Sequence, residues 1–170
     1  MSYVDLNTIH NPATGTVAPA AWGDQVRDND EFLIDPPVCS VKATVAQSIA
    51  TGTTTVLVAG TEVFDNDGMH STVSNTSRIT IQTDGRYLVL ATVRFIANAT
   101  GVRFAEFRRN GATLDTIATS VGIGTLETVI SGSRAFVLTA GEYVEVVAHQ
   151  SSGGNLDVGL MDFTAVFLTR

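Results

Sequence analysis

The feature that most constrains this chain is a strand pattern that is apolar on both faces, over residues 87–96. Successive side chains of an extended strand point to opposite faces, and here each face bears apolar side chains. Such a strand is covered on both faces. A second sheet covers one, and another layer, such as a further copy of the same chain, covers the other. One face bears Tyr87, Val89, Ala91, Val93 and Phe95, and the other bears Leu88, Leu90 and Ile96.

A shorter strand pattern precedes this run. Residues 79–82, Ile-Thr-Ile-Gln, alternate apolar and polar side chains, which is typical of a half-buried strand. Residues 83–86 then favour a tight turn, because Gly85 can adopt a positive φ at no steric cost. We therefore expect the two strands to form a hairpin, with Gly85 in the left-handed conformation.

Residues 83–87, Thr-Asp-Gly-Arg-Tyr, resemble the T-x-G-x-Y motif in the central hairpin of tumour necrosis factor (TNF)-like jelly rolls and of the globular head of the first complement component. Residues 138–144 and 163–168 are similar to a later turn and the last strand of that family. The resemblance covers residues 38–170. It implies an all-β, two-sheet antiparallel jelly-roll sandwich that assembles as a homotrimer. It constrains function less, because a jelly roll hosts many functions.

Three shorter segments resemble bacteriophage proteins. Residues 64–70, FDNDGMH, and residues 75–78, NTSR, are similar to a version of the domain found in virion proteins and prophage genes. Residues 22–29, WGDQVRDN, resemble an N-terminal element of phage structural proteins. These likenesses imply a structural protein of a phage particle.

The remaining strands are expected from Thr- and Val-rich runs separated by turn signals. Their spacing is typical of a two-sheet sandwich, and we expect about nine or ten strands. Asn110-Gly111 is the strongest hairpin turn of the chain. Residues 126–137 fit either a strand pair or one long bent strand.

The first 37 residues follow a different pattern, which divides the chain into residues 1–37 and 38–170. Residues 1–17 predict an extended arm. Residues 18–34 predict a short helix that begins near Pro19 and ends before Asp35-Pro36-Pro37. Trp22, Val26 and Leu33 lie on one side of it. The helix could pack on its own domain, but we favour docking on a neighbouring virion protein, because the jelly roll does not need this segment.

Charge and hydropathy exclude two classes of partner. The chain has ten basic and seventeen acidic residues, a net charge of −7, so we expect no nucleic-acid partner. Its longest apolar run, residues 87–91, is far shorter than the roughly 20 residues that cross a bilayer, so we expect no membrane span. Residues 1–5 lack the features of a signal peptide. We therefore expect synthesis in a host cytoplasm, followed by incorporation into the virion.

No group of residues predicts catalysis. The three histidines, His10, His70 and His149, are far apart, and no nucleophile motif accompanies them. Cys39, the only cysteine, is expected to be a small buried side chain rather than a nucleophile. We therefore expect no catalytic residues, no cofactor and no enzymatic activity.

One acidic cluster has the spacing of a metal site. Asp65 and Asp67 alternate before Gly68, as oxygen ligands do in a calcium loop, but the downstream bidentate glutamate is missing. The alternative, which we favour, is an Asx-type turn between two strands.

Two functions remain. The first is a trimeric virion protein that decorates or stabilises the capsid, or forms a head fibre, and that residues 1–37 anchor to the major capsid protein or another virion protein. The second is a tail-tip or receptor-binding module that recognises a host ligand through loops at residues 65–77, 98–101 and 151–155. The residues expected to form interfaces or anchors are Trp22, Val26, Phe32, Leu33, Tyr87, Val89, Phe95, Phe163 and Phe167.

Overall fold

The structure, a computed structural model, describes residues 20–170. The expected arm and Pro19 lie outside the described residues. The chain divides into two compact units, Met1–Pro37 and Val38–Arg170. The described part of the first unit is the helix α1 (Ala20–Ile34). The second unit contains eleven strands.

Helix α1 is stabilised along one side by charge pairs. The Arg27 guanidinium lies 3.1 Å from the Asp24 carboxylate and 3.7 Å from that of Glu31, at the i,i+3 and i,i+4 spacings that favour a helix. The Asp35 N–H donates to the Glu31 carbonyl, and the two prolines that follow end the helix.

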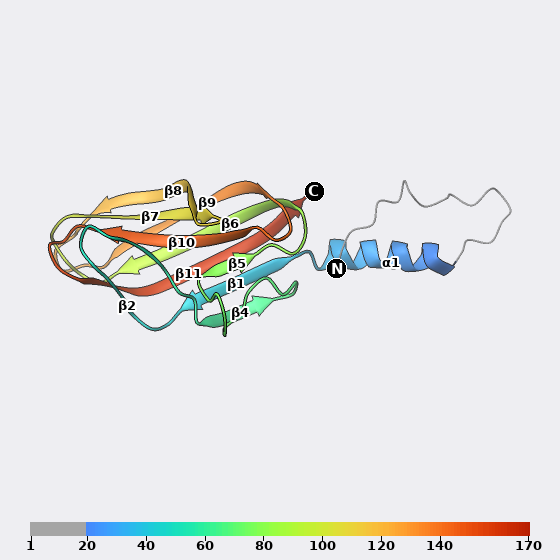
Figure 1. Ribbon diagram of the computed structural model, residues 1–170, viewed down its shortest axis with the longest axis horizontal. Coiled ribbons are helices and arrows are strands. Elements are labelled where there is room, and N and C mark those ends of the chain that lie inside the picture. The colour runs from blue at the N-terminus through green and yellow to red at the C-terminus, as the bar shows by residue number, and fades with distance from the viewer. Residues whose placement is uncertain (1–19) are drawn as a thin grey trace. The chain divides into compact units, whose positions relative to one another are not determined.

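The second unit is a sandwich of two antiparallel sheets, which we call sheet A and sheet B (Figure 1). Sheet A has the strand order β4-β1-β11-β6-β9, with β2 also paired to β11. It contains β1 (Val38–Ala43), β2 (Gln47–Ile49), β4 (Thr61–Asp65), β6 (Gly85–Phe95), β9 (Thr128–Leu138) and β11 (Leu156–Thr169). Sheet B has the order β3-β10-β7-β8, with β5 also paired to β10. It contains β3 (Thr54–Val56), β5 (Arg78–Thr80), β7 (Val102–Arg109), β8 (Ala112–Val121) and β10 (Tyr143–Gln150).

The expected all-β, two-sheet architecture is confirmed, and so is the β7–β8 hairpin. Asn110 and Gly111 have φ values of 51° and 79°, as a two-residue turn with both φ angles positive requires. Residues 128–138 form one strand rather than a pair. Strand β4 was not expected, because its Thr-Glu-Val-Phe-Asp sequence has little apolar alternation.

The expected hairpin at residues 79–96 is wrong. Strand β5 pairs with β10 in sheet B, where Ile79 lies opposite Val144, whereas β6 pairs with β9 and β11 in sheet A. Residues 81–84 therefore cross from one sheet to the other. Gly85 is not among the glycines with positive φ. It is the first residue of β6, and a Cβ there would collide with the ring of Phe167 and lie 2.9 Å from the Thr169 carbonyl oxygen. Close packing, not turn geometry, requires glycine at this position.

The core lies between the sheets and contains one face of β6. The Tyr87 and Phe167 rings meet edge to face, with centroids 5.5 Å apart. The Tyr87 hydroxyl donates a 2.7 Å hydrogen bond to the Thr83 carbonyl. This placement corrects five expected interface residues: within a single copy Tyr87, Val89, Phe95, Phe163 and Phe167 are at most 8% exposed. They stabilise the sandwich, and the opposite face of the same strands is available to a partner.

Candidate functional site

An apolar row crosses the outer face of sheet A. Successive strand pairings align Val38 with Val166, Val166 with Leu88, and Leu88 with Ala135. Because paired residues share a face, these side chains form one band over four strands. Phe64 on β4 and Val137 on β9 extend it, and they are 49% and 66% exposed. We call this set the sheet A row.

Small hydroxyl side chains lie beside the row. Ser40 and Thr164 share a 2.8 Å hydrogen bond between their hydroxyls, and Thr92 and Ser131 share one of 2.9 Å. Because these groups are short and already bonded to each other, a flat apolar surface can approach the row without leaving buried polar groups unpaired. The sequence indicated this face through Leu88 and Leu90, but it did not show that β1, β9 and β11 complete it.

Helix α1 exposes a second group of apolar side chains. Leu33 and Ile34 are 70% and 83% exposed, and Trp22 is also exposed. Val26 is half-buried, and Phe32 is buried. Of the expected anchor residues, Trp22 and Leu33 therefore have surface available to a partner, whereas Phe32 does not.

Three loops meet where β6, β8 and β10 end; we call residues 96–101, 122–127 and 151–155 the loop end. The Ser151 N–H donates to the Val102 carbonyl, and the Val102 N–H donates to the Ser151 hydroxyl. The Gly122 N–H donates to the Gly101 carbonyl. Two of the expected recognition loops, 98–101 and 151–155, are thus brought together. The third, 65–77, follows β4 and is tied to Val38 through Asn66, at the opposite end of the sheets.

Two fully buried polar side chains hold the loop end, and the sequence analysis missed both. The Arg103 guanidinium donates to the carbonyls of Asn98, Thr100 and Gly101 at 2.5–3.0 Å. Burial lowers its pKa. Gln150 donates to the Ile49 and Gly154 carbonyls and accepts from the Ser152 N–H at 2.6 Å. Their burial depends on residues distant in sequence, so no local pattern could have indicated it.

The acidic cluster at residues 65–68 is a turn. The two Asp65 carboxylate oxygens accept hydrogen bonds from the N–H groups of Asp67 and His70, and Asp67 accepts one from the Thr83 hydroxyl. Within residues 20–170, no three His, Cys, Asp or Glu side chains come together as a metal site would need. These contacts support the Asx-type alternative.

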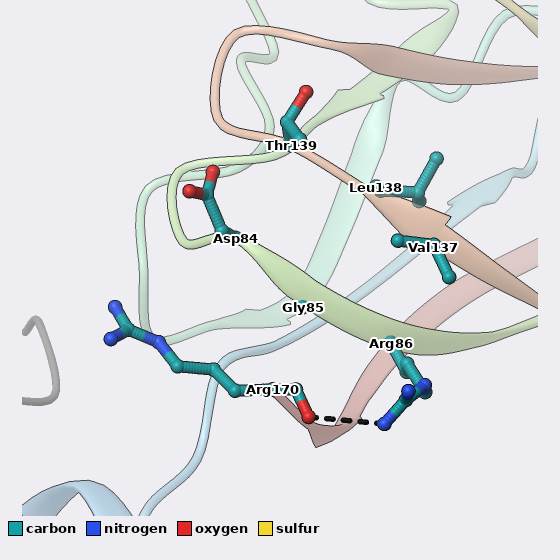
Figure 2. A pocket seen from close by; sticks show the side chains of 7 residues that line it. All are labelled: Asp84, Gly85, Arg86, Val137, Leu138, Thr139 and Arg170. Atoms are coloured by element: carbon teal, nitrogen blue, oxygen red, sulfur yellow. Dashed lines mark hydrogen bonds between the residues drawn. The ribbon is translucent and has the colours of Figure 1, made fainter.

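A pocket of about 370 Å³ lies beside the sheet A row, lined by Asp84, Gly85, Arg86, Val137, Leu138, Thr139 and Arg170 (Figure 2). Its polar groups have partners within the chain. The Arg86 guanidinium donates to the Arg170 main-chain oxygen at 3.1 Å, and the Asp84 carboxylate accepts from the Ala140 N–H at 2.6 Å. The pocket extends the exposed surface around Val137.

Cys39 is fully buried, and its surroundings oppose ionisation. Burial, followed by the nearby Asp65 and Glu62 carboxylates, raises the pKa of the thiol. Because the thiolate is the reactive form, we expect the native protein to resist alkylation at about pH 8 and to be labelled once denatured. Mass spectrometry after timed alkylation measures this. Rapid labelling of native protein would show that the thiol is accessible.

Among the described residues, the helix is too short and too polar to span a bilayer.

Comparison with known proteins identifies the fold alone. No family model and no curated protein matches the sequence. Among solved structures, the globular domain of zebrafish complement 1qA protein is similar, with a TM-score of 0.56 and 12% identity over 79% of this chain and 99% of that one. Murine APRIL is similar with a TM-score of 0.56 and 15% identity over 77% and 98%. The chain therefore has the jelly-roll fold of TNF-like and complement 1q-like domains.

Proposed function

We propose that this chain is a non-enzymatic structural protein of a bacteriophage virion. In this proposal residues 38–170 form a homotrimeric jelly-roll head, and residues 1–37 attach it to the major capsid protein or another virion protein. Its role is to decorate or stabilise the capsid, or to form a head fibre.

The sheet A row is the observation that supports self-association. Contiguous exposed apolar side chains on a soluble domain mark interaction surfaces, and copies of one chain associate symmetrically. Phe64 and Val137 remain about half to two-thirds exposed in one copy, so a second copy that covered them would bury apolar area. The fold likeness implies a trimer rather than another closed arrangement.

Two features support the virion role. Residues 22–29 and 64–70 resemble phage structural proteins in sequence. Helix α1 leaves the apolar side chains of Leu33 and Ile34 exposed to solvent. A partner protein that covered them would remove this unfavourable exposure.

The trimer is tested by placing a charge in the sheet A row. We expect the unaltered protein to sediment as a trimer at micromolar concentration and Leu88→Asp to sediment as a folded monomer. Leu88 points out of its own sandwich, so a single copy tolerates aspartate, whereas a buried interface would enclose an unpaired carboxylate. Analytical ultracentrifugation gives the mass, and circular dichroism gives the fold.

Thr119→Asp is the matched control, since Thr119 is an exposed strand residue of sheet B. We expect this variant to remain a trimer. A stable monomer of the unaltered protein, or a Leu88→Asp trimer as stable as the control, would contradict the proposed interface.

The loop end favours a second candidate, a recognition module at a tail tip. Arg103 and Gln150 hold its loops in one arrangement, and Val121, Ile123 and Leu126 are exposed there. A rigid, partly apolar surface suits a host protein. Quantitative mass spectrometry of purified particles separates the candidates. A copy number on the scale of the capsid lattice would indicate decoration, whereas a few copies per particle would indicate a tail or fibre tip.

A further inference from the structure

The His70 side chain lies between two backbone carbonyl groups. Its Nδ1 is 3.0 Å from the Arg78 carbonyl oxygen, and its Nε2 is 3.1 Å from that of Ala59. Ala59 precedes β4, and Arg78 begins β5, so the ring spans two segments distant in sequence. The loop at residues 66–77 connects β4 with β5 and contains the histidine.

The number of N–H groups on this ring decides how many of these hydrogen bonds form. A carbonyl oxygen only accepts, and a neutral imidazole has one N–H, so it can satisfy one of the two carbonyls. Its other nitrogen would then direct a lone pair at a carbonyl oxygen. The imidazolium has two N–H groups and satisfies both.

The charged groups around the ring come from three elements. Asp65, at the end of β4, accepts a 2.8 Å hydrogen bond from the His70 backbone N–H. Arg78 on β5 lines a second pocket together with His70, and its guanidinium lies over the Tyr143 ring, 4.5 Å from the centroid. Glu145 on β10 lies opposite Arg78 and accepts from the Ser77 hydroxyl. Two carboxylates, those of Asp65 and Glu145, and the Arg78 guanidinium are therefore charged groups of the segments that surround His70.

The contacts of the ring stabilise backbone pairings of the loop. The Ala59 N–H donates to the Thr76 carbonyl at 2.8 Å, and the Arg78 N–H donates to the Asn75 carbonyl at 3.3 Å. The middle of the loop is highly exposed, with Val73 91% accessible. The His70 ring thus contacts Ala59 and Arg78, the two residues whose N–H groups bond the last part of the loop at residues 66–77. The centre of this loop faces solvent.

We propose that His70 is a pH-sensitive clamp on residues 66–77. The imidazolium ties Ala59 to Arg78 and holds the loop closed. Loss of the ring proton as pH rises removes one of these hydrogen bonds and sets a lone pair against a carbonyl, so the loop opens more often. Because the second ring N–H is present only in the imidazolium, the clamp is present at acidic pH and is lost as pH rises. This property does not depend on the virion role or on the trimer.

Amide hydrogen exchange measured by NMR on the full chain tests the proposal. We expect protection factors at Ala59, His70 and Arg78 to fall about ten-fold or more from roughly pH 5 to roughly pH 8. Protection of core β6 amides serves as the internal reference. In His70→Gln, whose amide does not titrate, protection at Ala59 and Arg78 should be independent of pH.

His149→Gln is the matched control. His149 on β10 stacks on Phe104, with ring centroids 4.5 Å apart, and its backbone pairs with Thr54 and Phe104 in sheet B. It should keep the pH dependence of the unaltered protein. Should His70→Gln fail to fold, amide exchange of the unaltered chain still decides, because the clamp requires protection at Ala59 and Arg78 to fall as pH rises while that of β6 does not. Equal protection at both pH values would overturn it.

Discussion

Replacing Gly85 with valine is expected to destabilise the folded sandwich strongly. Gly85 is buried and pairs with Leu138, and an added Cβ would collide with the Phe167 ring. Neither the Phe167 ring nor the Thr169 carbonyl can move without a loss of packing or strand pairing. The Phe167 ring packs edge to face on Tyr87, and the Thr169 carbonyl belongs to a strand paired with β6. Overpacking of this kind costs about 3 kcal/mol or more, against a total stability of roughly 5–15 kcal/mol.

Thermal unfolding followed by circular dichroism measures this effect, with Gly60→Val as the matched control. Gly60 is exposed, is not among the residues with positive φ, and has open space around a built Cβ. We expect the control to unfold within a few degrees of the parent and Gly85→Val to aggregate or to show no cooperative transition. If both variants unfold alike, the close approach of β6 to β11 at Gly85 does not constrain the fold.

Deleting residues 1–37 is expected to abolish attachment to the particle while leaving a folded trimer. The deletion ends at the boundary between the two compact units, so the strands from β1 onward keep their pairings. The exposed apolar side chains of helix α1 would be lost with it. The measurement adds purified protein to particles that lack it and quantifies the amount bound after sedimentation.

Point variants make this result specific to the apolar side of the helix. Leu33→Asp should weaken binding strongly, because a carboxylate would replace an exposed apolar contact. Glu31→Gln changes the charged side, where Glu31 lies 3.7 Å from Arg27, and should bind like the parent. Full occupancy by the truncated protein would show that another surface attaches the chain.

Local patterns predicted most elements, because their causes are local. Alternation of apolar and polar side chains gave the strands, and Asn110-Gly111 set the β7–β8 turn through its own φ angles. The helix was predicted because good helix formers are followed by two prolines. The two-sheet architecture followed from the number and spacing of these strands and from the family resemblance.

The candidate sites were predicted less well. The sequence analysis recognised the outward-facing apolar residues of β6, but the residues that it assigned to the interface, such as Tyr87 and Phe95, face inward. Alternation shows that a strand has two faces, yet both faces of β6 are apolar. Choosing between them requires the position of sheet B.

The sequence by itself determined most of the strands, the turn at Asn110, and that both faces of β6 are apolar. Only the tertiary structure decided that β5 joins β10 rather than β6, why Gly85 cannot bear a side chain, and that Gln150 and His70 contact carbonyls of other segments of the chain. The physical reason is the separation in sequence over which each interaction acts. Backbone φ preferences and side-chain alternation act between neighbours, whereas steric exclusion by Phe167 and the hydrogen bond from Gln150 to Ile49 depend on residues that only folding brings together.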